Sequence, residues 1–225
     1  MERAYQRHLP HQFPEGVPIF LTWNLKGAFP DEVVERLQRY RESLEKTPAR
    51  AGETARERRI REDKLVFLMA DRFLDAATEG PMYLKDPAAA KIVEDSITFG
   101  IAERYDLFAW CIMANHVHVL LTPHWKMKKV TQGIKGYTAH EINGLQGARG
   151  RVFWQDESYD HWARDEEEML RIIWYIEQNP VAAGRCAKPE DWPWSSARLR
   201  PNWKCGEALR REHLRAETVR DMDAH

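Results

Sequence analysis

Two apolar runs separated by one polar residue constrain the fold more than any other feature of the sequence. Residues 106–114 read DLFAWCIMA, residues 116–122 read HVHVLLT, and Asn115 between them is a turn former. Apolar runs of this length on either side of such a turn predict two adjacent antiparallel strands. We therefore expect an antiparallel sheet built around a hairpin over residues 106–122.

The remaining elements surround this hairpin. The segment VPIFLTWNL is β-branched and aromatic and predicts an earlier strand, and GRVFWQ predicts a short later strand. The predicted strands cover residues 17–25, 106–114, 116–122 and 150–155, and the predicted helices cover 30–46, 52–80, 86–103, 127–146 and 166–178. This βαββα order indicates an α+β fold with an antiparallel sheet and helices on one of its faces.

The last helix has clear signals at both ends. Asp165 is a favourable N-cap and Glu168 three residues later completes a capping box. Asn179 and Pro180 are expected to end the helix. Between these ends, one face is apolar and is expected to be the core side: it carries Met169, Ile172, Ile173 and Ile176.

Composition sets the class of protein. The chain has 225 residues, of which 43% are hydrophobic and 31% charged, and its net charge is −1. We expect one domain over 1–200, with a helical insertion at about 30–80 and a charged tail over 201–225. No apolar run reaches the length of a membrane span, the first residues lack a signal-peptide core, and three widely spaced cysteines give no disulfide framework. A cytoplasmic location is the expectation.

The strand over 116–122 contains two histidines two residues apart. Because side chains alternate along a strand, His116 and His118 share one face and can bind a single cation together. An alternative is a surface or hydrogen-bonded pair. Two ligands do not make a metal site, so this interpretation requires a third.

The predicted helix 166–178 offers that third ligand. Tyr175 lies on the flank of its apolar face and Asn179 follows one turn later. If this edge faces the histidines, Asn179 is the third ligand and Tyr175 points at whatever the metal polarises. A half-buried tyrosine with an ordinary helix-end asparagine is the alternative. On residues alone, Tyr137 and Tyr159 are equal rivals as nucleophile.

Basic residues cluster directly after the histidine strand. The segment KMKKVTQGIKG holds four lysines and no acid, which suits a phosphate-binding surface or, alternatively, a solvated helix face. Tyr137 is expected to line the site on the same helix. His161 and His140 could contact DNA or the scissile phosphate, and a hydrogen-bonded structural histidine is the alternative for each. The candidate DNA-binding residues are Lys126, Lys128, Lys129, Lys135, Tyr137 and His161.

Five segments together resemble one known family. They are MANHVHVLLTP, GYTAHEIN, VFWQDESYDHWARDEEE, YIEQNPVAAG and WPWSSA, and LPHQFPEGVPIFLTWNL is similar to the start of one subgroup. The resemblance is to the REP-associated tyrosine transposases, which belong to the single-tyrosine HUH endonucleases of the IS200-like superfamily. It runs from about residue 8 to residue 198.

The resemblance implies a ferredoxin-like α+β fold and site-specific cleavage and rejoining of single-stranded DNA near hairpins, with Mg²⁺ or Mn²⁺ as cofactor. His116 and His118 match the family's metal pair, Tyr175 matches its nucleophile, and Asn179 matches the polar residue that helps to bind the metal. Ala114 stands where the motif commonly has proline. The implied partner is hairpin-bearing single-stranded DNA, and the protein is expected to act as a monomer or homodimer away from membranes.

Two other functions remain open at this point. A domesticated relative could grip hairpin DNA without cutting it. A histidine-triad nucleotide hydrolase would place a third histidine at the position of Leu120, and His124 is out of register with that pattern. A nicking assay with and without divalent metal would separate the three.

Overall fold

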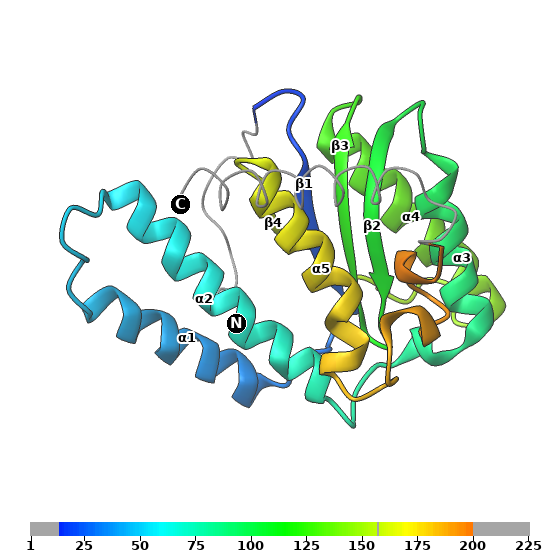
Figure 1. Cartoon of the computed structure of the whole chain (residues 1–225). Coiled ribbons are helices and arrows are strands. Elements are labelled where there is room, and N and C mark those ends of the chain that lie inside the picture. The colour runs from blue at the N-terminus through cyan, green and yellow to red at the C-terminus, as the bar shows by residue number, and fades with distance from the viewer. Residues whose placement is uncertain (1–13, 157, 200–225) are drawn as a thin grey trace.

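A four-stranded antiparallel sheet forms the centre of the fold (Figure 1). The computed structural model describes residues 14–156 and 158–199, so the whole predicted tail lies outside the described residues. The strands are β1 (Ile19–Asn24), β2 (Tyr105–Ile112), β3 (His116–Pro123) and β4 (Tyr159–Trp162). Their order across the sheet is β2-β3-β1-β4, and every neighbouring pair is antiparallel. This confirms the α+β, ferredoxin-like prediction.

Within the described residues, five α-helices accompany the sheet. They are α1 (Asp31–Lys46), α2 (Ala55–Ala76), α3 (Pro87–Phe99), α4 (Met127–Leu145) and α5 (Glu166–Ala182). Local capping explains where three of them begin. Thr54 and Glu57 form a capping box on α2, Asp86 accepts a hydrogen bond from the Ala88 N–H on α3, and Asp165 accepts one from the Glu168 N–H on α5. The Glu168 side chain, however, accepts from the Arg164 N–H, so the box predicted at α5 is only half formed.

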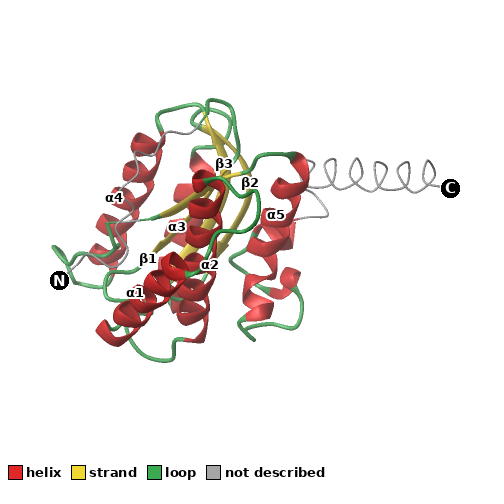
Figure 2. Ribbon diagram, turned by 90° about the vertical axis from the view of Figure 1, so that its left-hand side faces the viewer, coloured by secondary structure: helices red, strands yellow, loops and turns green. Residues whose placement is uncertain are grey.

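Helices cover both faces of the sheet, and the prediction of a single covered face is wrong. Helices α3 and α4 pack on one face against the side chains of Val117, Val119 and Leu121. The opposite face is covered by α2 and α5, which pack against Phe20 and Leu120. Figure 2 shows the strands between these two layers of helices. The reason is visible in β3, whose residues Val117 to Leu121 are almost entirely buried on both faces.

The fourth strand is also displaced from its predicted position. The predicted segment 150–155 makes an isolated bridge, between Trp154 and Leu25, and the side chains of Phe153 and Trp154 lie in the core. The strand that completes the sheet is β4, where Thr22 pairs with Tyr159 and Phe20 pairs with His161.

Helix α5 extends four residues beyond the predicted end. Pro180 lies inside it and has no N–H, so one intrahelical hydrogen bond is absent. The helix continues beyond this point, and the Ala183 N–H donates to the Asn179 carbonyl at 2.9 Å. The helix ends in a Schellman motif. Gly184, at φ 66°, donates to Val181 O and Arg185 donates to Pro180 O. Glycine 184, rather than the Asn179-Pro180 pair, is therefore the stop signal.

The segment after α5 returns to the outer edge of β2. The Ile112 N–H donates to Trp194 O at 2.9 Å, the Trp110 N–H donates to Ser196 Oγ at 3.1 Å, and the indole N–H of Trp192 donates to Ile112 O at 3.0 Å. The WPWSSA segment therefore lies along this strand as an ordered cover.

None of the helices in the described part of the chain is long and apolar enough to cross a membrane.

Candidate metal centre and tyrosine

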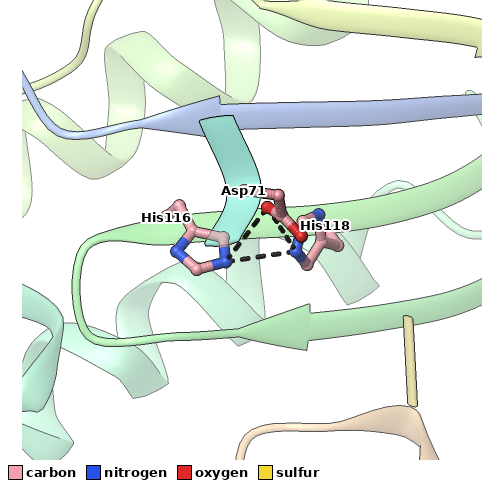
Figure 3. Close-up of side chains that lie close together, drawn as sticks. All are labelled: Asp71, His116 and His118. Atoms are coloured by element: carbon pink, nitrogen blue, oxygen red, sulfur yellow. Dashed lines mark hydrogen bonds and ion pairs between the residues drawn. The ribbon is translucent and has the colours of Figure 1, made fainter. Parts of the chain in front are cut away.

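His116 and His118 occupy the face of β3 that looks toward α2 and α5. Both side chains are fully buried, and their Nε2 atoms lie 3.1 Å apart (Figure 3). The alternation of the strand, with Val117 pointing to the other face, produces this pairing as the sequence predicted.

Neighbouring side chains fix the orientation of both imidazoles. Asn115 donates its amide to Leu74 O at 3.0 Å, which leaves its Oδ1 facing His116 Nδ1 at 2.7 Å. The Nδ1 of His116 therefore carries the proton, and its Nε2 presents a lone pair to the site. On the second ring, Nδ1 lies 2.7 Å from the Thr22 hydroxyl. A hydroxyl can accept or donate, so Thr22 supports either tautomer of His118.

A carboxylate from α2 completes the cluster. Asp71 Oδ1 lies 3.4 Å from His118 Nε2 and 3.7 Å from His116 Nε2. One turn along α2, Asp75 Oδ1 lies 3.6 Å from His116 Nε2. Sequence reasoning missed both residues. The one signal available was their i, i+4 spacing, which puts two acids on the same helix face as the buried Leu74.

Burial controls the charges in this cluster. Desolvation lowers the pKa of His116 and of His118 to about 3, so both rings are neutral at pH 7. Burial raises the pKa of the Asp71 carboxyl, and burial together with the charge of Asp71 raises the pKa of Asp75 to about 8. Two buried acids thus face two neutral imidazoles.

Such a donor set fits a metal ion. Neutral imidazole nitrogens and carboxylate oxygens are the ligands of divalent transition metals. The buried Oδ1 atoms of Asp71, Asp75 and Asn179 have no hydrogen-bond partner. Since buried acceptors are normally paired, these oxygens indicate a place for a cation. The Asp71–His116–His118 group could hold one.

Tyr175 and Asn179 reach the same cluster from α5. The Tyr175 hydroxyl donates to Asp71 Oδ2, and the Asn179 amide donates to the same oxygen at 3.3 Å. The Tyr175 ring centroid lies 5.9 Å from that of His118, so one chain supplies both groups. Burial and the adjacent carboxylates raise the pKa of the Tyr175 hydroxyl, which therefore keeps its proton at neutral pH.

The two rival tyrosines are placed differently. Tyr159 lies on the same face as the histidines, but it is buried and its ring stacks on Phe67 with centroids 3.8 Å apart. Tyr137 is 55% exposed on α4, across the sheet from the histidines, so the expectation that it lines their site is wrong. His140 is exposed on the same helix. Leu120, the third position of a histidine triad, is an apolar core residue.

The predicted DNA-binding residues are divided between the two faces. Lys126, Lys128 and Lys135 line a groove of about 1610 Å³ between α4, residues 151–156 and the start of β1, and Trp125 and Arg151 also line it. Lys129 is exposed on α4.

His161 is on the histidine face, with its Nε2 2.9 Å from Glu168 Oε1. Burial lowers its pKa.

Part of the sequence is similar to known transposases. Residues 91–179 match the family model described as IS200-like transposase. A protein of Haemophilus influenzae named as a REP-associated tyrosine transposase is 25% identical over 103 residues, which are 41% of this chain and 58% of that protein. The chain thus spans less than two thirds of the length of this curated relative.

One solved structure supports the fold. A REP-associated tyrosine transposase bound to a REP hairpin superposes with a TM-score of 0.51 at 14% identity, covering 85% of this chain and 82% of that one. A protein of Deinococcus radiodurans R1 named as a transposase gives a TM-score of 0.34 at 16% identity, covering 77% and 98%. Residues 91–179 are therefore similar to the IS200-like transposases, and the fold is similar to that of a REP-associated tyrosine transposase.

Proposed function

We propose that this protein is a metal-dependent enzyme that cleaves and rejoins single-stranded DNA beside hairpins, with Tyr175 as nucleophile. One observation carries the proposal: the Tyr175 hydroxyl and the His116–His118 pair both contact the same buried carboxylate, Asp71. A tyrosine that only packed in the core would have no reason to meet a metal-type donor set.

The residues divide the chemistry between them. The oxygen of Tyr175 attacks the scissile phosphorus, the bond to the 3′ oxygen breaks, and that oxygen leaves with a proton as a 3′-OH. The product is a 5′-phosphotyrosine, so one phosphodiester replaces another and rejoining needs no ATP. The Tyr175 hydroxyl points its proton at Asp71 Oδ2, which leaves the oxygen lone pairs for the phosphate. A bound divalent ion would withdraw charge from that phosphate.

His116, His118 and Asp71 would hold this ion, with Asn179 contributing its unpaired amide oxygen. Because two of the donors are imidazole nitrogens, the set suits Mn²⁺ better than Mg²⁺, although Mg²⁺ can serve where it is the more abundant ion.

The lysine-lined groove is the proposed binding surface for the DNA hairpin. Lys126 and Lys128 are exposed there beside the half-exposed ring of Trp125, a combination that suits a phosphate backbone with unpaired bases. Lys135 is held by the loop, since its Nζ donates to Gln155 O at 2.6 Å. Lys129, Tyr137 and His161 remain proposed contacts at the margins of the bound DNA.

The test is Tyr175→Phe, which removes the attacking oxygen and keeps the ring packed against Phe20. We expect normal folding and hairpin binding, and no covalent adduct with a suicide DNA substrate in the presence of Mn²⁺. Tyr137→Phe and Tyr159→Phe should still form the adduct. An adduct mapped by mass spectrometry to Tyr137 or Tyr159 would contradict the assignment. Hairpin binding without any cleavage by the unaltered protein would identify a non-catalytic DNA-binding relative instead.

A further inference from the structure

Helices α1 and α2 form a hairpin that is inserted between β1 and α3, before the segment that matches the family model. Within this hairpin, α2 packs on the sheet and buries several side chains, whereas α1 buries only Leu37. The residues that α2 buries are Asp63, Val66, Phe67, Ala70, Asp71 and Leu74. The stretch of α2 from Val66 to Leu74 therefore makes the contact that holds the hairpin to the body of the protein, while Asp63 contacts α1.

Acidic groups interrupt this apolar contact. Asp71 is 2% exposed and Asp75 lies one turn later, and an Oδ1 atom from each is buried without a hydrogen-bond partner. The amide of Asn179 lies 3.3 Å from Asp71 Oδ2 and 3.4 Å from Asp75 Oδ2, and its own oxygen is also unpaired. In the described residues, these are the buried side-chain oxygens without a partner, and all three gather beside the histidine pair.

Hydrogen bonding within the chain does not satisfy this group. The Nδ1–H of His116 is committed to Asn115, so its Nε2 cannot donate to the Asp71 and Asp75 oxygens, whose Oδ1 atoms stay without a partner. Buried oxygens brought together in this way are stabilised by protons or by a cation that lies among them. A divalent ion bound by imidazole nitrogens and carboxylate oxygens would satisfy all of them at once.

We propose that Asp71 and Asp75 are both metal ligands, so that the ion clamps the inserted α1–α2 hairpin onto the histidine strand. This rests on the metal site of the proposed function and extends it, because the hairpin becomes part of the metal centre. The ion joins three segments that are distant in sequence: α2, β3 and the end of α5. Metal binding and docking of α2 are then a single coupled event.

The experiment uses the full chain and Mn²⁺ alone, without DNA. Mn²⁺ affinity is measured by calorimetry, and docking of α2 is measured by hydrogen exchange of residues 55–76 with and without Mn²⁺. In the unaltered protein we expect Mn²⁺ to slow exchange in the second half of α2 at least tenfold. Asp75→Asn and Asp71→Asn should each weaken Mn²⁺ binding at least tenfold and lose that protection.

Asp63→Asn is the matched control. It changes the same residue type in the same helix, but Asp63 bonds Arg41 of α1 at 2.9 Å rather than facing the histidines. This variant should bind Mn²⁺ as the unaltered protein does. Far-UV circular dichroism of the metal-free variants checks that each has folded, and the two asparagine variants at the site provide independent readings.

His118→Ala separates this inference from the proposed function. If His118→Ala and Asp71→Asn lose Mn²⁺ binding while Asp75→Asn retains it, the metal site of the proposed function stands and the clamp through both acids is overturned. Unchanged exchange of α2 on adding Mn²⁺ would overturn it as well. If the unaltered protein binds no Mn²⁺, the clamp and the metal-dependent function both fail.

Discussion

Asn115→Ala should both destabilise the fold and weaken metal binding. Asn115 is 2% exposed, and its side chain joins Leu74 of α2 to His116 of β3 through hydrogen bonds of 3.0 and 2.7 Å. Alanine leaves His116 Nδ1 buried without a partner, which costs about 1–3 kcal/mol. Leu74 O keeps a weaker bond from the Ala77 N–H at 3.4 Å, so its loss costs about 1 kcal/mol.

The expected destabilisation is therefore about 2–4 kcal/mol, which lowers Tm by about 4–16 °C for a chain of this size. The same change removes the hydrogen bond that fixes the ring orientation and the tautomer of His116. Loss of an orienting partner of this kind weakens metal binding by about 10–100-fold. The assays are thermal unfolding of the metal-free protein and calorimetric titration with Mn²⁺.

Asn143→Ala is a close control. Asn143 is 5% exposed, donates to Arg151 O at 2.7 Å and accepts from Arg151 Nε at 2.9 Å, all on the opposite side of the sheet. It should lose a similar amount of stability and keep its Mn²⁺ affinity. Equal Mn²⁺ affinities for the two variants would refute the role of Asn115 in orienting His116.

Three further outcomes follow from single contacts. Replacing Lys126 and Lys128 with alanine should weaken hairpin DNA binding and reduce the slope of log affinity against log salt by about 1–2, whereas Lys85→Ala outside the groove should not; an unchanged slope would exclude the groove. Gly100→Ala should destabilise the protein by about 1–3 kcal/mol, because the added Cβ would lie 2.4 Å from the buried Tyr105 ring. Gly133→Ala, which has open space around it in α4, should stabilise the protein by about 0.5–1 kcal/mol. Equal unfolding midpoints in urea would contradict both. The hydrogen bond from Arg61 lowers the pKa of Glu53 to about 2. The contribution of the Glu53 carboxylate to stability is therefore complete above pH 4.5 and is lost as the pH falls toward 2. The Tm difference between the unaltered protein and Glu53→Gln should shrink from about pH 6 to about pH 3, and a constant difference would exclude this linkage.

Local signals in the sequence were sufficient for much of the fold. The hairpin over β2 and β3 was predictable because both runs and the turn are contiguous, and the start of α5 was predictable because its N-cap is a local contact. The end of α5 was mispredicted because Pro180 costs a single hydrogen bond, while Gly184 supplies the stop. The second helical layer was missed because burial of β3 on both faces depends on where α2 docks.

The site was likewise predictable only in part. The spacing of His116 and His118 along one strand was sufficient to predict that they share a face. Tyr175 needed the family resemblance, because three tyrosines were equal on the residues alone. Asp71 lies 104 positions from Tyr175, so their contact depends on how an inserted hairpin packs against the last helix. Sequence periodicity carries no information about that contact.

The cover along β2 has a consequence for association between molecules. An uncovered edge strand offers a row of free N–H and C=O groups to which a strand of another molecule can add. Here the N–H groups of Trp110 and Ile112 are already committed to Ser196 and Trp194. A second copy could extend the sheet at this edge only if it displaced residues 192–196 from β2. Helix α5 would then lose the tether between its Glu177 and Ser196, which lie 2.9 Å apart, so sheet-to-sheet growth here would loosen the helix that carries Tyr175.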